Sequence, residues 1–145
     1  MVALFAFLHH LAAFAVVATI ATEFVLLRGE IDARAARTLR IVDAVYGASA
    51  GALLLIGALR VFYFEKGSAY YFSSAPFYAK MGLFLAVGLL SIHPTLTFRA
   101  WGNSPNVDAR QLRLVRRLVH WELAAIVGIL LCAALMARGI GFIAR

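Results

Sequence analysis

The sequence is poor in cysteine and in charged residues. Its 145 residues include one cysteine, Cys132, inside an apolar run. A single cysteine excludes an internal disulfide framework and a cysteine-based metal motif. Charged residues make up 14% of the chain, against about 25% in soluble domains. With so few charges, a soluble domain of this length would expose a large apolar surface, so we exclude a soluble globular protein.

Acidic residues are scarcer than basic ones. The chain has 7 Asp and Glu against 14 Lys and Arg, which gives a net charge of +7. A strongly basic chain can indicate nucleic-acid binding, but here no basic face alternates with polar residues in a water-soluble frame. We therefore expect no nucleic-acid partner and interpret the surplus as arginine that flanks membrane spans.

The hydrophobic residues, 63% of the chain, fall into four long segments. These run over residues 3–27, 41–62, 77–98 and 118–137, and each is near the roughly 20 residues that span a bilayer. The first has no positive n-region and no cleavage context, which predicts a retained span and not a signal peptide. Short connections predict an all-α, up-down-up-down four-helix bundle in one transmembrane domain, residues 1–145.

Basic residues predict the orientation in the membrane. One end of the predicted bundle, here called the basic end, carries Arg28, Arg34, Arg37, Arg40, Arg99, Arg110, Arg113, Arg116 and Arg117. The other end, here called the terminal end because both chain termini lie there, carries Arg60, Lys66, Lys80, Arg138 and Arg145. By the positive-inside rule the basic end is cytoplasmic, and both termini lie outside.

A charged side chain near the centre of a span costs about 2.5–3.5 kcal/mol to insert into the membrane. Each ionisable residue inside a span is therefore expected to have a polar partner or a functional role. Near the basic end, every span brings a carboxylate or an imidazole to the same level: Glu23, Asp43, His93, and His120 with Glu122. At about 100° per residue, Asp43 shares a stripe with small residues and is expected to point inward. His120 aligns with Ala124 and Gly128, whereas Glu122 is rotated by about 200° from His120, so the two cannot both face the centre.

Inward carboxylates and imidazoles on facing helices are how four-helix bundles bind metal ions. Glu23, Asp43, His93 and His120, with Glu122 at the same level, are therefore candidate ligands for Zn, Fe, Mn or Cu. A buried polar network is the alternative, for example Glu23 or Asp43 paired with Arg40 or Arg117, or snorkelling at the interface. A proton relay through the same groups is a third interpretation.

A second group of candidates lies near the terminal end. His9 lies about 10 Å inside the first span and Lys80 about one turn into the third, so both are expected to face one cavity. An imidazole in apolar surroundings is a candidate haem ligand, and Lys80 or Arg60 would pair with a propionate. His10 is on another face, where it would contact a second subunit or lipid headgroups. A helix–helix hydrogen bond from His9 is the alternative.

Several motifs together resemble the DUF2214 family of predicted bacterial membrane proteins, over the whole chain. They are Leu8-His9-His10, the Arg-rich first loop, Phe77-Tyr78-Ala79-Lys80, His93, and Arg117-Leu118-Val119-His120-Trp121-Glu122. More distantly, the chain is similar to HemJ-type protoporphyrinogen oxidases and CopD-type membrane proteins. It departs from HemJ after the first histidine, where Trp and Gly are missing, and at His120-Trp121-Glu122-Leu123-Ala124, where HemJ proteins have Asn-Glu-x-Pro.

The HemJ resemblance implies that His9 is the haem ligand and that Lys80, His93 and Glu122 are the matching site residues. It implies haem b, a porphyrin or quinone partner and a bacterial inner-membrane location. We therefore expect a haem- or metal-binding membrane protein with a redox role. The alternatives are transition-metal transport or sensing, and a non-catalytic accessory subunit, so enzymatic activity is left open. Two polar faces on one helix also predict a homo-oligomer in the lipid bilayer.

Overall fold

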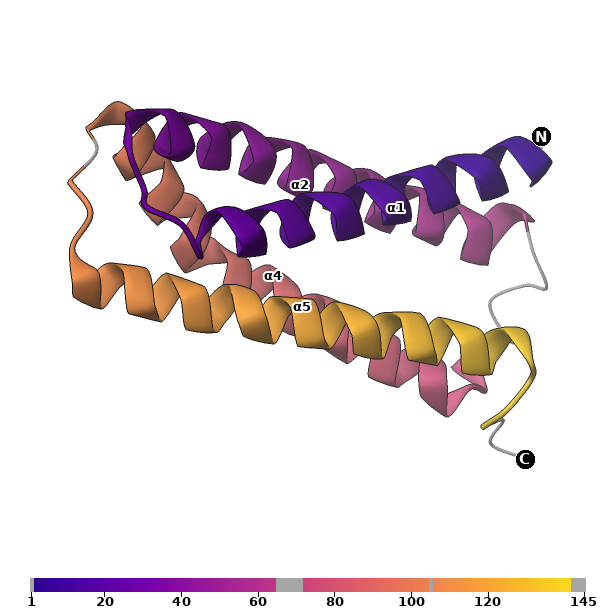
Figure 1. Ribbon diagram of the computed structural model, residues 1–145. Coiled ribbons are helices and arrows are strands. Elements are labelled where there is room, and N and C mark those ends of the chain that lie inside the picture. Colours follow the sequence, from indigo (N-terminus) through magenta and orange to yellow (C-terminus); the bar gives the residue numbers. More distant parts are fainter. Residues whose placement is uncertain (1, 65–71, 105, 142–145) are drawn as a thin grey trace.

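The computed structural model describes residues 2–64, 72–104 and 106–141 and shows a bundle of long helices (Figure 1). These are α1 (Val2–Leu26), α2 (Ala33–Leu59), α4 (Ala75–Asn103) and α5 (Ala109–Ala137), and a short π-helical segment, η1 (Arg60–Phe64), continues α2. In the described part of the chain, these four helices are long and apolar enough to cross a membrane. The all-α membrane bundle predicted from the sequence is thereby confirmed.

The helices form a square arrangement in which sequence neighbours run antiparallel (Figure 1). α1 packs along α2 and α5, and α4 packs along the same two helices. No close backbone contact joins α1 to α4 among the described residues, so these two helices are diagonal partners. The α1–α2 and α4–α5 connections lie together at the basic end, while α1 begins and α5 finishes at the terminal end.

Helices α2 and α5 start well before the apolar spans predicted at residues 41 and 118. Each begins after an aspartate that caps it: an Asp32 carboxylate oxygen accepts a hydrogen bond from Ala35 N (2.7 Å), and one of Asp108 accepts from Gln111 N (3.4 Å). Capping satisfies backbone N–H groups that the first helical turn leaves unpaired. Hydropathy locates only the apolar part of a helix, which is why the arginine-rich first turns were not predicted as helical.

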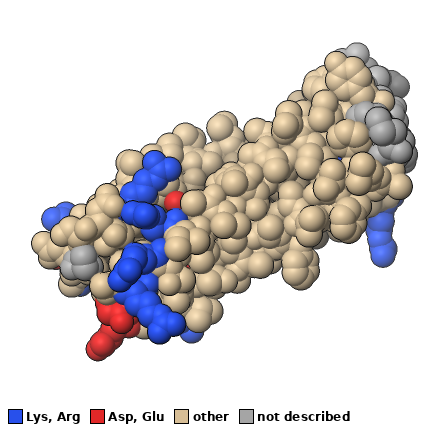
Figure 2. Space-filling model, turned by 90° about the horizontal axis from the view of Figure 1, so that it is seen from above, with Lys and Arg blue, Asp and Glu red and all other residues tan. Residues whose placement is uncertain are grey.

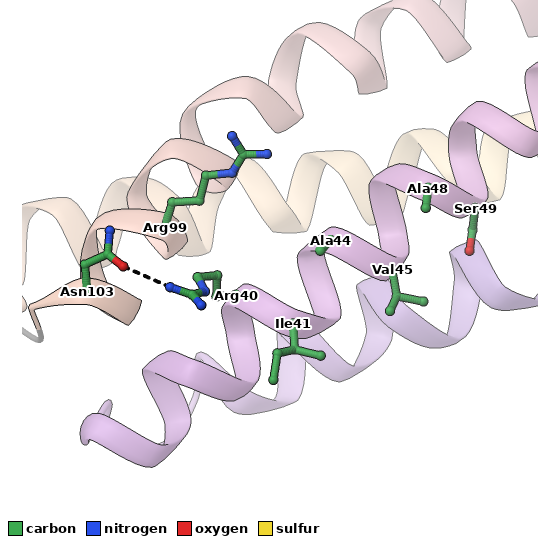
Figure 3. Close-up of a pocket in the computed structure, with 8 residues that line it drawn as sticks. All are labelled: Arg40, Ile41, Ala44, Val45, Ala48, Ser49, Arg99 and Asn103. Carbon is green, nitrogen blue, oxygen red and sulfur yellow. Dashed lines mark hydrogen bonds between the residues drawn. The ribbon is translucent and has the colours of Figure 1, made fainter.

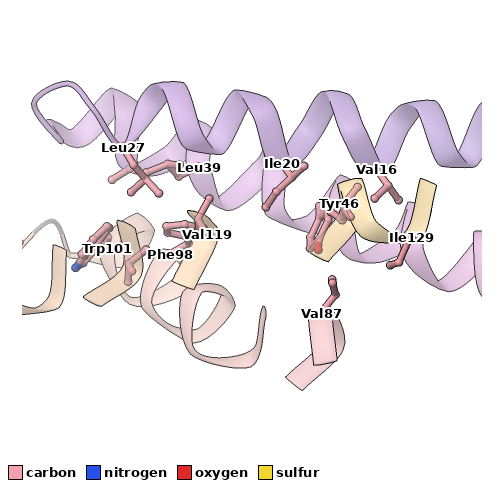
Figure 4. Packing of buried hydrophobic residues seen from close by; sticks show 13 residues of the cluster. Val16, Ile20, Leu27, Leu39, Tyr46, Val87, Phe98, Trp101, Val119 and Ile129 are labelled. Carbon is pink, nitrogen blue, oxygen red and sulfur yellow. The ribbon is translucent and has the colours of Figure 1, made fainter. Parts of the chain in front are cut away.

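The buried side chains are concentrated toward the basic end. Leu27, Leu39, Phe98, Trp101 and Val119 pack together there (Figure 4), and each is at most 2% exposed. Further toward the terminal end, most large apolar side chains are exposed, including Leu4, Phe7, Leu11, Leu54, Leu55, Leu85 and Leu131. In a bilayer such side chains contact lipid, so the tightly packed interior is confined to about half of the bundle's length.

Charged side chains, like the buried ones, are concentrated toward the basic end of the bundle. Figure 2 shows a band of Lys and Arg side chains near one end and a middle zone almost without charge. Lys66 and Arg145, counted above at the terminal end, lie outside the described residues. The band matches the arginine asymmetry of the sequence, and the cytoplasmic location of the basic end stays a prediction.

Cysteine labelling measures this orientation. In a Cys132→Ser background, Ser104→Cys reports on the basic end and Ile140→Cys on the terminal end, because both side chains are exposed. We expect a membrane-impermeant maleimide to label Ile140→Cys in intact cells and Ser104→Cys only after permeabilisation. The reverse pattern would show that the basic end faces outward.

Candidate functional site

Three acidic side chains from three helices are buried in the interior near the basic end. Glu23 of α1 is 1% exposed, Asp43 of α2 is 5% exposed and Glu122 of α5 is 1% exposed. Their carboxyl groups lie close enough to interact electrostatically with one another and with the phenol of Tyr46. We call Glu23, Asp43, Tyr46, Thr95 and Glu122 the carboxyl cluster.

Two hydrogen bonds between helices hold the carboxyl cluster. Tyr46 Oη on α2 donates to Glu122 Oε2 on α5 at 3.1 Å, and Thr95 Oγ1 on α4 donates to Asp43 Oδ1 at 2.8 Å. One carboxyl oxygen of each glutamate lacks a hydrogen bond: within the described residues, Glu23 Oε1 and Glu122 Oε1 are buried and have no partner. The cluster therefore keeps two acceptor positions open for a proton or another ligand.

The acidic residues occupy positions that otherwise form the apolar core. On α5 the buried residues recur at alternating steps of four and three, and Glu122 falls within this series: Val115, Val119, Glu122, Ile126 and Ile129. Similar spacing places Glu23 and Asp43 in their own helices: Val16, Ile20 and Glu23 on α1, followed by Leu27 directly after its end, and Ala36, Leu39, Asp43 and Tyr46 on α2. Such alternating steps keep side chains on one helix face, as in coiled coils. The helix geometry thus directs each carboxyl group into the bundle.

The carboxyl cluster lies one to two helical turns inside the arginines of the basic end, since Asp43 follows Arg40 by one turn and Glu122 follows Arg117 by about 7 Å of rise. Arg99 interacts electrostatically with Asp43. No direct ion pair forms with the arginines proposed as partners in the part of the chain that the structure describes. Instead, Arg40 donates a hydrogen bond to Asn103 Oδ1 at 2.9 Å.

The structure does not assemble the predicted mixed set of carboxylates and imidazoles. His93 and His120 are both exposed, and the ring of His120 lies 6.3 Å from the ring of Phe24. Among the described residues, no three His, Cys, Asp or Glu side chains come together in a way that could hold a metal ion. The prediction that His120 faces the centre is wrong; the inward residue of that pair is Glu122, and Asp43 points inward as predicted.

The error has a geometric cause. Residues spaced by four drift about 40° per step around a helix, so the stripe of His120, Ala124 and Gly128 does not stay on one face. Gly128 does approach α4, since a Cβ there would lie 3.0 Å from Leu83 Cδ1, but His120 and Ala124 have turned outward. In α4, Gly82 and His93 share an exposed face. These two stripes of small residues, on α4 and α5, therefore do not mark the interior of the bundle.

At the terminal end, His9 faces protein while His10 does not. The His9 ring lies against α2, where a Cβ on Gly57 would be 3.4 Å from His9 Cε1. His10 is exposed, and its Nδ1 donates to Ala6 O at 2.6 Å. Arg60 in η1 and Lys80 in α4 are half-buried. Because α1 and α4 are diagonal, no backbone contact brings His9 and Lys80 together, and their shared cavity stays a prediction.

Tyr46 and Thr95 complete the carboxyl cluster, and neither is among the site residues predicted from the sequence. The position of Tyr46 could have been predicted, because Tyr46 follows Asp43 by three residues and so lies on the same helix face. The sequence gives less indication that Thr95 faces the cluster: Thr95 only follows Pro94, a buried residue inside α4. Its partner Asp43 is 52 residues away in sequence, and only the packing of α4 against α2 brings the two together.

Removal of the Tyr46 hydroxyl tests the hydrogen bond to Glu122. We expect Tyr46→Phe to lower the free energy of unfolding by about 1–3 kcal/mol, because it leaves a buried acceptor unpaired. The matched control is Tyr78→Phe, whose hydroxyl donates to Phe72 O at an exposed site, and which should change stability by about 0.5 kcal/mol or less. Unfolding in detergent measures both, and equal losses would argue against the buried bond.

Comparison with known proteins gives a family and no closer relative. No curated protein and no solved structure matches the chain. The family described as a predicted membrane protein, DUF2214, matches residues 1–141. Since this match covers nearly the whole chain and the helices have the length and hydropathy of membrane spans, the protein belongs to the DUF2214 family of predicted membrane proteins.

Proposed function

We propose that this protein takes up and transfers protons within the membrane through the carboxyl cluster. The observation that carries the proposal is the burial of Glu23, Asp43 and Glu122 together, with a free acceptor oxygen on each glutamate among the described residues. Intramembrane carboxyl groups that face a bundle interior characteristically serve ion pathways and proton relays.

The composition of the cluster favours a proton over a metal ion. Three like charges in a low-dielectric interior need protons or cations to balance them. The described residues present no metal-binding group, whereas the carboxyl, phenol and hydroxyl groups of the cluster all exchange protons. The bond from Tyr46 to Glu122 and that from Thr95 to Asp43 link these groups between helices.

A cavity at the basic end lies one helical turn from Glu23. It has a volume of about 300 Å³ and is lined by Phe24, Leu27, Arg28, Arg116, Arg117 and His120. Leu27, whose backbone N–H donates to Glu23 O at 2.9 Å, lines the cavity one turn beyond Glu23, and no residue of the cluster lines it. Histidine is the side chain that exchanges protons most readily near neutral pH. In this proposal, His120 passes protons between water and Glu23.

Proton flux into liposomes tests the proposal. Purified protein is reconstituted with an internal pH dye, and a potassium diffusion potential drives proton entry. We expect Glu23→Gln and Glu122→Gln to reduce the flux by about 100-fold, the effect typical of losing a positioned proton-transfer group. Glu30→Gln is the matched control, because Glu30 is exposed in the α1–α2 connection and its loss should leave the flux unchanged.

Two results would contradict proton transfer. The first is a wild-type flux equal to that of empty liposomes, and the second is full flux in both glutamine variants. Monodisperse elution and an unchanged melting profile ensure that a lost flux does not reflect unfolding.

Haem binding at His9 is a second candidate function. The position of His9 favours it, because His9 is half-buried against α2 while the neighbouring His10 is exposed. The terminal end also contains few fully buried large side chains among the described residues. Haem would supply one-electron redox chemistry, and Arg60 or Lys80 would hold a propionate. This candidate fits the redox role that the HemJ resemblance implies.

The visible spectrum tests haem binding. After haem-replete expression, we expect the purified protein to show a Soret band that His9→Ala abolishes, because the axial ligand is lost. His10→Ala is the matched control and should keep the band. A wild-type protein without a Soret band, or an unchanged band in His9→Ala, would exclude His9 as a haem ligand.

A further inference from the structure

A groove on the outer surface of the bundle runs between α2 and α4 (Figure 3), and Arg99, which lines it, also interacts electrostatically with Asp43 of the carboxyl cluster. It has a volume of about 710 Å³ and is lined by Arg40, Ile41, Ala44, Val45, Ala48, Ser49, Arg99 and Asn103. Arg40, Arg99 and Asn103 lie at its basic end, and the other lining residues follow α2 toward the middle of the membrane. One end is thus cationic and the rest is almost entirely apolar.

The side chain of Arg40 is held in place at the cationic end. Its guanidinium crosses from α2 to α4 and donates to Asn103 Oδ1 at 2.9 Å (Figure 3). Gly102 makes this crossing possible, because a Cβ there would lie only 2.8 Å from Arg40 Cδ. No carboxylate pairs with Arg40 in the described part of the chain, so its positive charge is fixed in position and left available.

The apolar part of the groove has the dimensions of a lipid chain. Ala44 and Ala48 are four residues apart on α2, and their short side chains leave space between the helices. From Arg40 to Ser49 the helix rises about 14 Å. This length is close to half of a hydrocarbon core about 30 Å thick, which is the depth that one acyl chain occupies.

We propose that the α2–α4 groove binds one anionic phospholipid. Arg40 and Arg99 contact the phosphodiester, and an acyl chain lies along Ala44 and Ala48. Guanidinium groups bind phosphate oxygens with strong, charge-assisted hydrogen bonds, and basic pockets between transmembrane helices recognise anionic headgroups. A second copy in a two-fold dimer fits less well, because the arginines of one groove would face those of the other.

Lipid binding is measured by native mass spectrometry of the full chain and by its melting temperature in detergent. The probes are phosphatidylglycerol, phosphatidylcholine with the same acyl chains, and inorganic phosphate. We expect phosphatidylglycerol to bind at least about tenfold more tightly than phosphatidylcholine. Inorganic phosphate should not raise the melting temperature, since it lacks the acyl chain that fills the apolar groove.

Three variants remove separate parts of the site. Arg40→Ala with Arg99→Ala removes the charges, Gly102→Leu displaces the Arg40 side chain, and Ala48→Phe fills the apolar groove. Each should lower the affinity for phosphatidylglycerol by about tenfold or more. The matched control, Arg34→Ala with Arg37→Ala, removes equal charge from α2 outside the groove and should keep the wild-type affinity.

Four outcomes would overturn the proposal. Equal binding of the two lipids would exclude headgroup recognition, and an equal loss in the control variant would indicate a diffuse effect of charge. Stabilisation by inorganic phosphate alone would indicate a phosphate site. A dimer that Ala48→Phe converts to monomer would show that a second copy occupies the groove.

Discussion

Burial of three carboxyl groups in one membrane bundle is the constraint on which the rest of the structure depends. A charged group at the centre of a span costs about 2.5–3.5 kcal/mol on insertion scales, and Glu23, Asp43 and Glu122 occupy neighbouring buried positions one to two turns inside the basic end. Hydrogen bonds from Tyr46 and Thr95 offset part of this cost and tie α2 to α5 and to α4. The best-packed apolar residues surround the same level, so the polar cluster and the densest part of the core support each other.

The basic end positions this cluster relative to the membrane surface. Aspartate caps extend α2 and α5 beyond the apolar spans, and these extensions carry arginines that lie at the headgroup level. The carboxyl groups then lie one to two turns deeper than these arginines, and the cavity lined by Phe24 and His120 lies between the two levels in the proposed proton route. Arg40, on the extension of α2, also borders the α2–α4 groove, as Arg116 and Arg117 on the extension of α5 border the cavity. One structural feature, the extended basic helices, therefore serves both proposed sites.

The sequence predicted the spans well because a bilayer requires long apolar helices whatever their neighbours are. It also predicted that Asp43 points inward and that His9 and His10 lie on different faces. It failed where a choice depended on which helix face meets another helix. His120 shares a stripe with small residues, yet Glu122 is the buried residue, since the core uses the alternating spacing of Val119, Glu122 and Ile126. Partners such as Tyr46 with Glu122, 76 residues apart, follow only from the tertiary packing.

In the proposed proton transfer, Glu23, Asp43 and Glu122 act as one proton-binding unit. Infrared spectroscopy of the carboxyl C=O stretch, followed through a pH titration of the purified protein, measures this most directly. If the three carboxyl groups are coupled, Glu23→Gln removes one protonated-carboxyl band and also shifts the titration of the bands that remain. If Glu23→Gln removes its own band and leaves the others unchanged, the carboxyl groups are independent and the account is contradicted.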